Sequence, residues 1–348
     1  MTVITAAGTP ADLGHAHGRM AASAIRSGLA AWRADFTDRG KDADALIEAL
    51  SHDAEFRAAV RHHLPDLATE VDAIAAGSGC TPEEIFAINC LDEAWWWDES
   101  GAGCSVLAAA GSTTSPGVAG QNMDLDTWMD RTQVVLRLAP ESGPRQVLLS
   151  RAGLVGLCGV NDRGLVVLVN TLDQLPEDPA GVPVAFVLRA LTGCLNLAQA
   201  VDLLHELPHA SGQAYTLASP DGVRGFECGA GVVREYVNDD SRPNLRWHTN
   251  HPLAYSPEGS GTGGPATGSS QPRYDHASKV AQGDVDAATV EELLTDTESG
   301  ICMFPGRWRD DGFTFGSIIA SLSVPPRVRI ALGPPDRVPY EVVDFPSN

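Results

Sequence analysis

The chain has 348 residues and a mass of 36.6 kDa, with 43% hydrophobic and 20% charged residues. These proportions are typical of a folded globular protein and exclude a wholly disordered chain. The 45 acidic residues exceed the 24 basic ones, which gives a formal net charge of −21. This excess of negative charge repels phosphate backbones and argues against nucleic-acid binding.

The seven cysteines indicate the compartment of the protein. They are odd in number and form no C-x-x-C pair, so neither a disulfide framework nor a zinc ribbon is predicted. The chain has no run of the roughly 18–20 apolar residues that a membrane helix needs. Its first residues lack the basic and apolar regions of a secretory leader. We therefore expect a cytoplasmic protein with reduced thiols and no membrane contact.

The residues before position 104 have helical periodicity. Apolar residues recur at helical spacing from Pro10 to Trp32, over 44–62, and again after Pro65. The segment Thr81-Pro82-Glu83-Glu84 places a Thr N-cap before a proline and has Glu84 three residues after the cap. It predicts a short helix that runs to Asn89.

From residue 104 onward, β-strands predominate. Runs of apolar and β-branched residues between turn residues predict strands over 104–111, 118–124, 132–140, 145–153, 164–170, 213–219, 222–229, 231–237, 313–324, 327–335 and 340–345. Helices are predicted near 183–191, 197–205 and 290–294, and the Gly/Ser/Pro-rich segment 256–272 is either a mobile connector or a lid. This order of elements favours an α+β fold in which helices cover antiparallel sheets.

The junction Gly101-Ala102-Gly103-Cys104-Ser105 carries the clearest chemical signal. A thiol directly after glycine can attack the preceding carbonyl and move the acyl group from nitrogen to sulfur. Hydrolysis of the resulting thioester would cut the chain and leave Cys104 with a free α-amine, whose reference pKa is roughly 7.7–8.0. From the local sequence alone, a Gly-Cys pair before a strand is far more often a buried structural thiol.

Eight short motifs occur in an order that resembles the family of acyl-coenzyme A:6-aminopenicillanic acid acyltransferase, the autoproteolytic cysteine members of the N-terminal nucleophile (Ntn) hydrolases. They are GTPADLGHAHG (8–18), EVDAIAAGSGCTPEEIFAINCLDE (70–93), GCS (103–105), GQNMD (120–124), GVNDRGLVVLVNTL (159–172), GVPVAFVLRALTGCLNLAQAVDLL (181–204), WHTNHPL (247–253) and GPPDRVPY (333–340). In GQNMD, Met123 stands where the family usually has an aromatic residue. That departure puts the substrate in doubt and leaves the reaction type as expected.

The resemblance implies a four-layer αββα sandwich, with two antiparallel sheets between helices. It implies self-cleavage between Gly103 and Cys104. Residues 1–103 would form a helical fragment that stays bound to the catalytic fragment 104–348, and the two together would make one structural domain.

The resemblance also assigns roles to three residues. Cys104 would be the nucleophile in self-cleavage and then in acyl transfer, with its freed α-amine as general base. Asp124 would orient that amine, and the Asn250 amide would donate a hydrogen bond to the oxyanion. A turn-capping Asp124 and an Asn250 that satisfies backbone groups are the alternatives.

Three further residues are candidates for substrate binding. Arg273 could bind a substrate carboxylate with its guanidinium fork or form a surface salt bridge, and Arg131 has the same two interpretations. Trp96, in the Trp95-Trp96-Trp97 run, could line an acyl pocket or simply pack at a helix end. The acids that flank this run, including Asp92 and Glu93, would favour a cationic amine if they border the pocket.

Two histidine pairs do not predict a metal site. His248 and His251 are three apart in a strand-like segment, which puts their rings on opposite faces. His15 and His17 are two apart in a predicted helix and do not share a face. We expect neither a metal nor an organic cofactor.

Together these features predict a self-cleaving cysteine Ntn enzyme that acts on a small-molecule amide or thioester. Hydrolysis is favoured over N-acyl transfer from an amide or acyl-coenzyme A donor, because water needs no acceptor site. A non-catalytic, uncleaved binding protein of the same fold is the remaining alternative.

Overall fold

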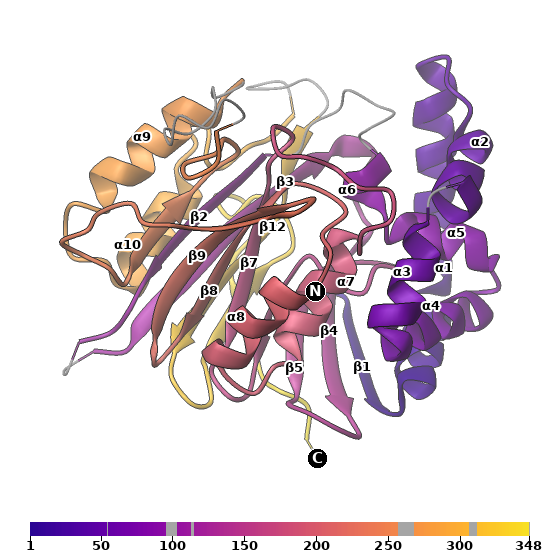
Figure 1. Ribbon diagram of the computed structural model, residues 1–348, viewed down its shortest axis with the longest axis horizontal. Coiled ribbons are helices and arrows are strands. Elements are labelled where there is room, and N and C mark those ends of the chain that lie inside the picture. The colour runs from indigo at the N-terminus through magenta and orange to yellow at the C-terminus, as the bar shows by residue number, and fades with distance from the viewer. Residues whose placement is uncertain (54, 95–102, 113–114, 257–267, 306–311, 348) are drawn as a thin grey trace.

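Two stacked β-sheets form the centre of the protein, and helices cover both outer faces (Figure 1). The computed structural model describes the chain except for residues 54, 95–102, 113–114, 257–267, 306–311 and 348. The predicted α+β fold with four αββα layers is confirmed. In the part of the chain that the structure describes, no helix combines the length and the apolar character that crossing a membrane requires.

The first sheet has six strands, which are antiparallel throughout and lie in the order β11-β2-β3-β12-β13-β14. Their bounds are β2 Gly103–Ala109, β3 Gly117–Asp126, β11 Leu245–His248, β12 Gly312–Leu322, β13 Val328–Ala331 and β14 Glu341–Val343. The first residues of the catalytic fragment predicted above therefore form a central strand, with β11 on one side and β3 on the other.

The second sheet has eight strands in the order β1-β4-β5-β6-β7-β8-β9-β10. Their bounds are β1 Val3–Gly8, β4 Gln133–Pro140, β5 Gln146–Arg151, β6 Cys158–Asn161, β7 Val166–Thr171, β8 Gln213–Ser219, β9 Gly222–Gly229 and β10 Val232–Tyr236. Only the β1–β4 pair is parallel. The segment before Gly103 is therefore not wholly helical, because its first strand extends this sheet.

The helices divide into two groups. On the eight-stranded sheet lie α1 Pro10–Asp38, α2 Ala43–Glu48, α3 Phe56–His63, α4 Pro65–Ser78, α5 Pro82–Ile88, α6 Leu91–Ala94, α7 Val184–Thr192 and α8 Leu197–Glu206. On the six-stranded sheet lie α9 Ser270–Val280 and α10 Ala287–Thr295. Figure 1 shows α9 and α10 at one side of the sheets and α1–α5 at the opposite side.

The alternation of side chains along β2 explains the layering. Val106 and Ala108 point into the apolar core between the two sheets, whereas Leu107 and Ala109 pack under α9 and α10. Successive strand residues face opposite sides, so a strand that is apolar at every position is buried on both faces. β2 is buried along its whole length.

Two predicted segments differ from the structure. The predicted helix over 44–62 is interrupted by a π-helical turn at Ala49–Asp53. A helix, α9, begins at Ser270, where the sequence predicted a loop to residue 272. The residues that α9 buries include Ser270 and Arg273, so it lacks the apolar stripe by which periodicity identifies a helix.

Candidate active site

Cys104 lies on β2 just beyond the point where its neighbour β11 stops pairing. β11 pairs with β2 only from Val106 to Ala109, so on that side the backbone of Cys104 has no strand partner. Two side chains take the place of the missing strand. The Cys104 N–H donates to Asn250 Oδ1 at 2.9 Å, and the Cys104 carbonyl accepts from Arg273 Nη1 at 2.7 Å. The backbone nitrogen that self-cleavage would turn into an α-amine is thus held by a side chain.

The Cys104 thiol is enclosed. It is 1% exposed, and its Sγ lies 3.3 Å from Met123 Sδ on the paired strand β3. Burial raises the pKa of this thiol, and the nearby negative charge of Asp124 raises it further. The thiol therefore keeps its proton at neutral pH and needs a base before it can act as a nucleophile.

Asp124 stands beside the predicted cleavage point. It pairs across the sheet with Gly103, and a Cβ placed on Gly103 would lie 3.0 Å from Asp124 Oδ2. Glycine is the residue that leaves room for the carboxylate there. The motifs GCS and GQNMD, which follow one another in the sequence, meet at this point.

The position of Asp124 is fixed from the other side by β12. Thr314 Oγ1 donates to Asp124 Oδ1 at 2.6 Å and accepts from the Met303 N–H at 2.8 Å. The β3–β12 register shifts between Thr314 and Gly316, which marks a β-bulge. Bulges next to active sites re-aim side chains, and here the bulge follows the residue that holds the carboxylate.

Asn250 lies in the turn after β11 and joins three segments. Its Oδ1 accepts from Cys104 N–H and from Arg273 Nη2, the latter at 2.9 Å, and its Nδ2 donates to the Thr171 carbonyl at 3.0 Å. Its own N–H donates to Ser270 Oγ at 2.8 Å. A primary amide has two N–H hydrogens. One is used on Thr171, and the second is the one that the predicted oxyanion contact would use.

Glu227 on β9 anchors the same turn. Its carboxylate accepts from His248 Nε2 at 3.1 Å and from the N–H groups of Ala254 and Tyr255 at 2.9 and 2.8 Å. Burial alone would raise the pKa of Glu227, but the hydrogen bonds from His248 and the backbone lower it by more. His251 faces the other way, with Nδ1 2.8 Å from Ser270 Oγ, and burial lowers its pKa to about 4. Both histidines hold the turn.

The three predicted substrate-binding residues have different placements. Arg273 is 2% exposed, so it does not lie on the surface; its guanidinium contacts the Cys104 carbonyl, Ser105 Oγ at 3.0 Å and Asn250 Oδ1. The first turn of α9 directs it inward, which the sequence did not reveal because α9 was read as loop. Arg131 is far more open, with a side chain 93% exposed and paired with Asp130. Trp96 lies outside the described residues.

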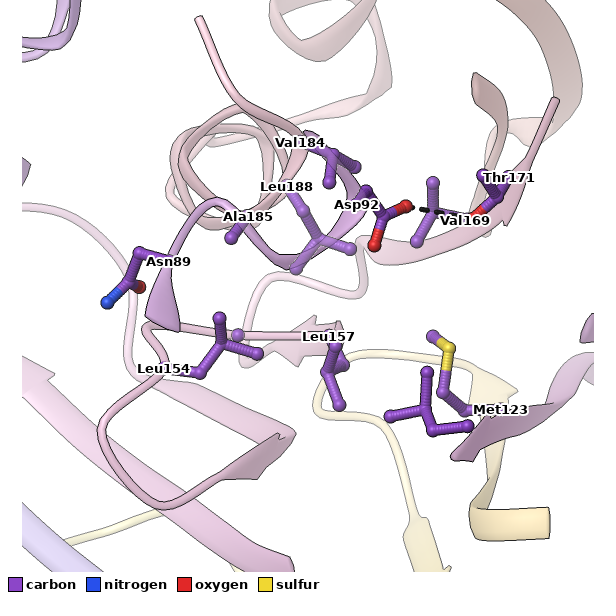
Figure 2. Close-up of a pocket in the computed structure, with 12 residues that line it drawn as sticks. Asn89, Asp92, Met123, Leu154, Leu157, Val169, Thr171, Val184, Ala185 and Leu188 are labelled. Atoms are coloured by element: carbon purple, nitrogen blue, oxygen red, sulfur yellow. Dashed lines mark hydrogen bonds between the residues drawn. The ribbon is translucent and has the colours of Figure 1, made fainter. Parts of the chain in front are cut away.

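An apolar pocket opens beside Met123 (Figure 2). Its lining surrounds about 430 Å³ of non-atom space, including the part open to solvent, but only about 20 Å³ of it admits the centre of a water-sized sphere. It is lined by Asn89, Asp92, Met123, Leu125, Leu154, Gly156, Leu157, Val169, Thr171, Val184, Ala185 and Leu188. Met123 and Thr171 connect this pocket to the site, because Met123 contacts the thiol and Thr171 accepts from Asn250.

Several residues that position the site were not singled out from the sequence. Thr314, Ser270, Glu227 and Thr171 each hold one of the predicted residues or its turn. A buried hydroxyl or carboxylate far away in sequence leaves no local pattern. The bulge at Thr314 would be the nearest detectable signal, because FTFGS interrupts strict alternation with a glycine.

Comparison with known proteins identifies the family. Residues 112–336 match the family described as acyl-coenzyme A:6-aminopenicillanic acid acyl-transferase, which is more than half of the chain. The chain is 26% identical over 190 residues to the 40 kDa form of acyl-coenzyme A:6-aminopenicillanic-acid-acyltransferase of Emericella nidulans. That alignment covers 54% of this chain and 52% of the relative, so the chain spans about half the length of the curated relative it matches.

Solved structures were compared as well. A variant of the conjugated bile acid hydrolase of Clostridium perfringens superposes with a TM-score of 0.45 at 10% identity, over 70% of this chain and 97% of that chain. Penicillin V acylase of Agrobacterium tumefaciens superposes with a TM-score of 0.44 at 14% identity, over 66% of this chain and 83% of that one.

Proposed function

Because the chain belongs to the acyl-coenzyme A:6-aminopenicillanic acid acyltransferase family, we propose that it is a self-cleaving cysteine Ntn enzyme that hydrolyses a small-molecule amide through an acyl-Cys104 intermediate. One observation carries the proposal. Asn250 holds the Cys104 N–H, Asp124 stands against Gly103, and an apolar pocket begins at Met123, next to the thiol. The nucleophile, the future base and an apolar lining thus meet at one residue.

The first reaction is self-cleavage between Gly103 and Cys104. Cys104 Sγ attacks the Gly103 carbonyl carbon, a C–S bond forms, the C–N bond breaks, and the thiol proton passes to the released nitrogen. Water then hydrolyses the thioester and frees the Gly103 carboxylate and the thiol. Asp124 and Asn250 hold the two sides of the scissile peptide during this step.

The second reaction uses the α-amine that cleavage releases. The neutral amine, held by Asn250 Oδ1, takes the thiol proton as sulfur attacks the substrate carbonyl. The free hydrogen of Asn250 Nδ2 stabilises the oxyanion, a contact worth about 2.7–4 kcal/mol in comparable sites. The leaving amine takes the proton from the α-ammonium, and the acyl group remains on Cys104 until water removes it.

N-acyl transfer is the second candidate, because the family and the curated relative are named as acyltransferases. In that case an amine replaces water, and the donor is an amide or an acyl-coenzyme A thioester. The pocket serves both reactions equally, since the acyl-Cys104 intermediate is common to them. In either case residues 1–103 stay bound to residues 104–348, through the β1–β4 pairing and the contacts between α1 and α4 and the rest of that layer.

Intact mass under denaturing conditions tests the proposal. Scaling 36.6 kDa by fragment length, cleavage before Cys104 gives fragments of about 11 and about 26 kDa. We expect two fragments in wild type and in Cys158→Ala, a matched control at another fully buried thiol, and one chain in Cys104→Ala. A wild type that remains uncut contradicts the proposal and favours a non-catalytic binding protein.

Turnover separates hydrolase from transferase. Amide and thioester substrates are offered with and without an added primary amine, and the products are identified by mass. Release of free acid without added amine supports hydrolysis. Acyl product that forms only with the amine supports transfer.

A further inference from the structure

A second cavity lies away from the candidate active site, where the start of α4 meets the ends of β4 and α7. Its lining surrounds about 790 Å³ of non-atom space, including the part open to solvent, and about 280 Å³ of it admits the centre of a water-sized sphere. It shares no lining residue with the pocket beside Met123, for which the second figure is about 20 Å³. The second cavity is therefore the roomier of the two and forms a separate site.

Three buried polar side chains form one wall of this cavity. Arg189, which is 4% exposed, donates from Nη1 to Gln146 Oε1 at 2.6 Å and from Nη2 to Glu70 Oε2 at 3.1 Å. Glu70 and Gln146 are each 2% exposed. The two terminal nitrogens of one planar guanidinium hold both of them, so these side chains lie side by side in the wall.

Glu70 and Gln146 each keep one hydrogen-bonding atom free. Among the residues that the structure describes, Glu70 Oε1 accepts no hydrogen bond and Gln146 Nε2 donates none. Neither atom is sealed from solvent, in contrast to Arg189 Nε, which is buried without a partner. Both side chains line the cavity and are otherwise buried, so the cavity gives access to these two atoms. It thus offers a ligand an anionic acceptor beside a neutral donor.

The charge around the cavity favours a cation. Asp66 and Glu141 line it at exposed positions, and among its described lining residues Arg189 is the only Arg or Lys. Partial desolvation lowers the pKa of His63, so this lining residue adds little positive charge at pH 7. Burial raises the pKa of Glu70, and Arg189 lowers it by less. One guanidinium therefore does not offset the cost of burying this carboxylate, and an ammonium at Oε1 would reduce that cost.

Apolar side chains form the rest of the wall that a ligand would contact. Leu13 comes from α1, Leu64 and Leu67 from the start of α4, and Ala190 from the end of α7. They would bury a branched alkyl group. A ligand that suits the cavity therefore has an alkyl group next to its polar end.

We propose that this cavity binds an apolar primary amine that carries a hydroxyl or amide oxygen on the neighbouring carbon. The ammonium donates to Glu70 Oε1, the oxygen accepts from Gln146 Nε2, and the alkyl group packs on the leucines. The inference stands apart from the proposed function, because no residue of the candidate active site takes part in it.

The walls of the cavity come from both sides of the predicted cleavage point. α1 and α4 precede Gly103, whereas β4, β5 and α7 follow Cys104. A ligand that fills the cavity therefore contacts both segments, in an intact chain and in a cleaved one. Because such a ligand binds only the folded arrangement, it should stabilise the association of the two segments.

Isothermal titration calorimetry of the whole protein with L-leucinol tests the proposal. L-Leucinol has the ammonium, the neighbouring hydroxyl and an isobutyl group, and it has no amide or ester bond that the enzyme could cleave. We expect a Kd of about 1 mM or below, which a ligand of this size can reach. 2,4-Dimethylpentan-1-ol, in which methyl replaces the ammonium, should bind at least about 10-fold more weakly. 4-Methylpentan-2-amine, in which hydrogen replaces the hydroxyl, should bind about 3- to 10-fold more weakly.

Two variants test the placement of the ligand. Glu70→Gln keeps the shape of the side chain and removes its charge, so it should weaken L-leucinol binding at least about 10-fold. A Cβ on Gly193 would lie 3.6 Å from Gln146 Nε2. Gly193→Leu therefore fills the cavity without removing the Glu70–Arg189 pair and should abolish detectable binding. Asp202→Asn removes an exposed acid of α8 outside the cavity, and as the control it should keep the Kd within about 2-fold.

The outcomes are distinct from those for the proposed function. Loss of L-leucinol binding in both cavity variants, with binding retained in Asp202→Asn, supports the inference. A wild type that does not bind L-leucinol, equal affinity for the alcohol without ammonium, or binding that both cavity variants leave unchanged overturns it. If the variants do not fold, the comparison of the three ligands on wild type still decides. A wild type that stays uncut overturns the proposed function and leaves this inference standing.

Discussion

Replacing Arg273 by methionine tests whether side chains take the place of the missing strand beside Cys104. Methionine keeps a long apolar stem and removes the guanidinium. The change deletes the hydrogen bonds to the Cys104 carbonyl, Ser105 Oγ and Asn250 Oδ1. Both carbonyl-type oxygens are buried, and Asn250 Oδ1 keeps only one donor.

The expected loss follows from those contacts. The buried Cys104 carbonyl loses its donor, which costs about 1–3 kcal/mol, and Asn250 Oδ1 loses one of two hydrogen bonds, worth about 0.5–1.5 kcal/mol, so we predict a loss of about 1.5–4.5 kcal/mol in the free energy of unfolding. Arg273→Lys can restore one bond and should lose less. Because Arg273 also fixes the oxygen that holds the Cys104 N–H, we expect self-cleavage in Arg273→Met to slow by at least about 10-fold, equivalent to about 1.4 kcal/mol.

Urea denaturation of the uncleaved Cys104→Ala background measures the stability, and the time course of fragment appearance after refolding measures the cleavage. Arg163→Met is the control, since Arg163 is exposed in the β6–β7 turn and should change stability by less than about 0.5 kcal/mol. If Arg273→Met unfolds at the wild-type urea concentration and cleaves at the wild-type rate, the guanidinium does not hold the site and this reasoning fails.

Three further predictions address the cleavage point and the core. Gly103→Ala places a methyl 3.0 Å from the Asp124 carboxylate and should leave most of the chain uncut by intact mass; wild-type cleavage would show that the carboxylate moves freely. Burial lowers the pKa of His17 to about 4, below its unfolded value, so its contribution is complete above about pH 6.5 and is lost as pH falls toward 4. Urea titrations at pH 7 and 5 should differ by about 2 kcal/mol more in wild type than in His17→Gln, and equal differences would count against it. Arg151 is fully buried, its guanidinium lies 4.8 Å from the centre of the Trp128 ring, and it has no hydrogen-bond partner among the described residues. Arg151→Met should therefore raise the free energy of unfolding by about 1–3 kcal/mol. A decrease of similar size in urea denaturation would show that the contact with the ring outweighs the cost of burying the charge.

The sequence predicted the fold class well because the two kinds of periodicity occupy different parts of the chain. Helical spacing predominates before residue 104, and short apolar, β-branched runs between turns predominate after it. Two of the elements that it missed bury little apolar surface of their own. β1 is a six-residue edge strand with two buried side chains, and α9 buries polar groups. Periodicity detects apolar stripes, so elements that are held by pairing or by polar contacts escape it.

The residues of the candidate site are far apart in sequence, so only part of the site could be predicted. Gly103 and Cys104 were singled out by their local sequence, Asp124 and Asn250 by motifs that resemble the family, and the structure brings these residues together. The roles assigned to them remain predictions. The surface alternative for Arg273 is wrong, because its inward direction depends on where α9 begins, and its role in substrate binding stays a prediction. Asp92 was noticed only as part of an acidic segment, since burial beside a pocket depends on tertiary packing.

The early end of β11 explains how the backbone nitrogen of Cys104 can become a catalytic amine. A nucleophile with a freed amine needs a backbone nitrogen that no neighbouring strand uses, yet a buried N–H without a partner is costly. Ending β11 at His248 releases the Cys104 N–H from the ladder, and the Asn250 side chain then accepts it. A side-chain amide can keep that contact when the peptide N–H becomes an amine, whereas a strand ladder would hold the residue as part of the sheet. The same turn sends Nδ2 to Thr171, whose hydroxyl reaches Asp92. The geometry that frees the base is thereby coupled to the wall of the pocket beside Met123, so substitutions at Thr171 should disturb self-cleavage.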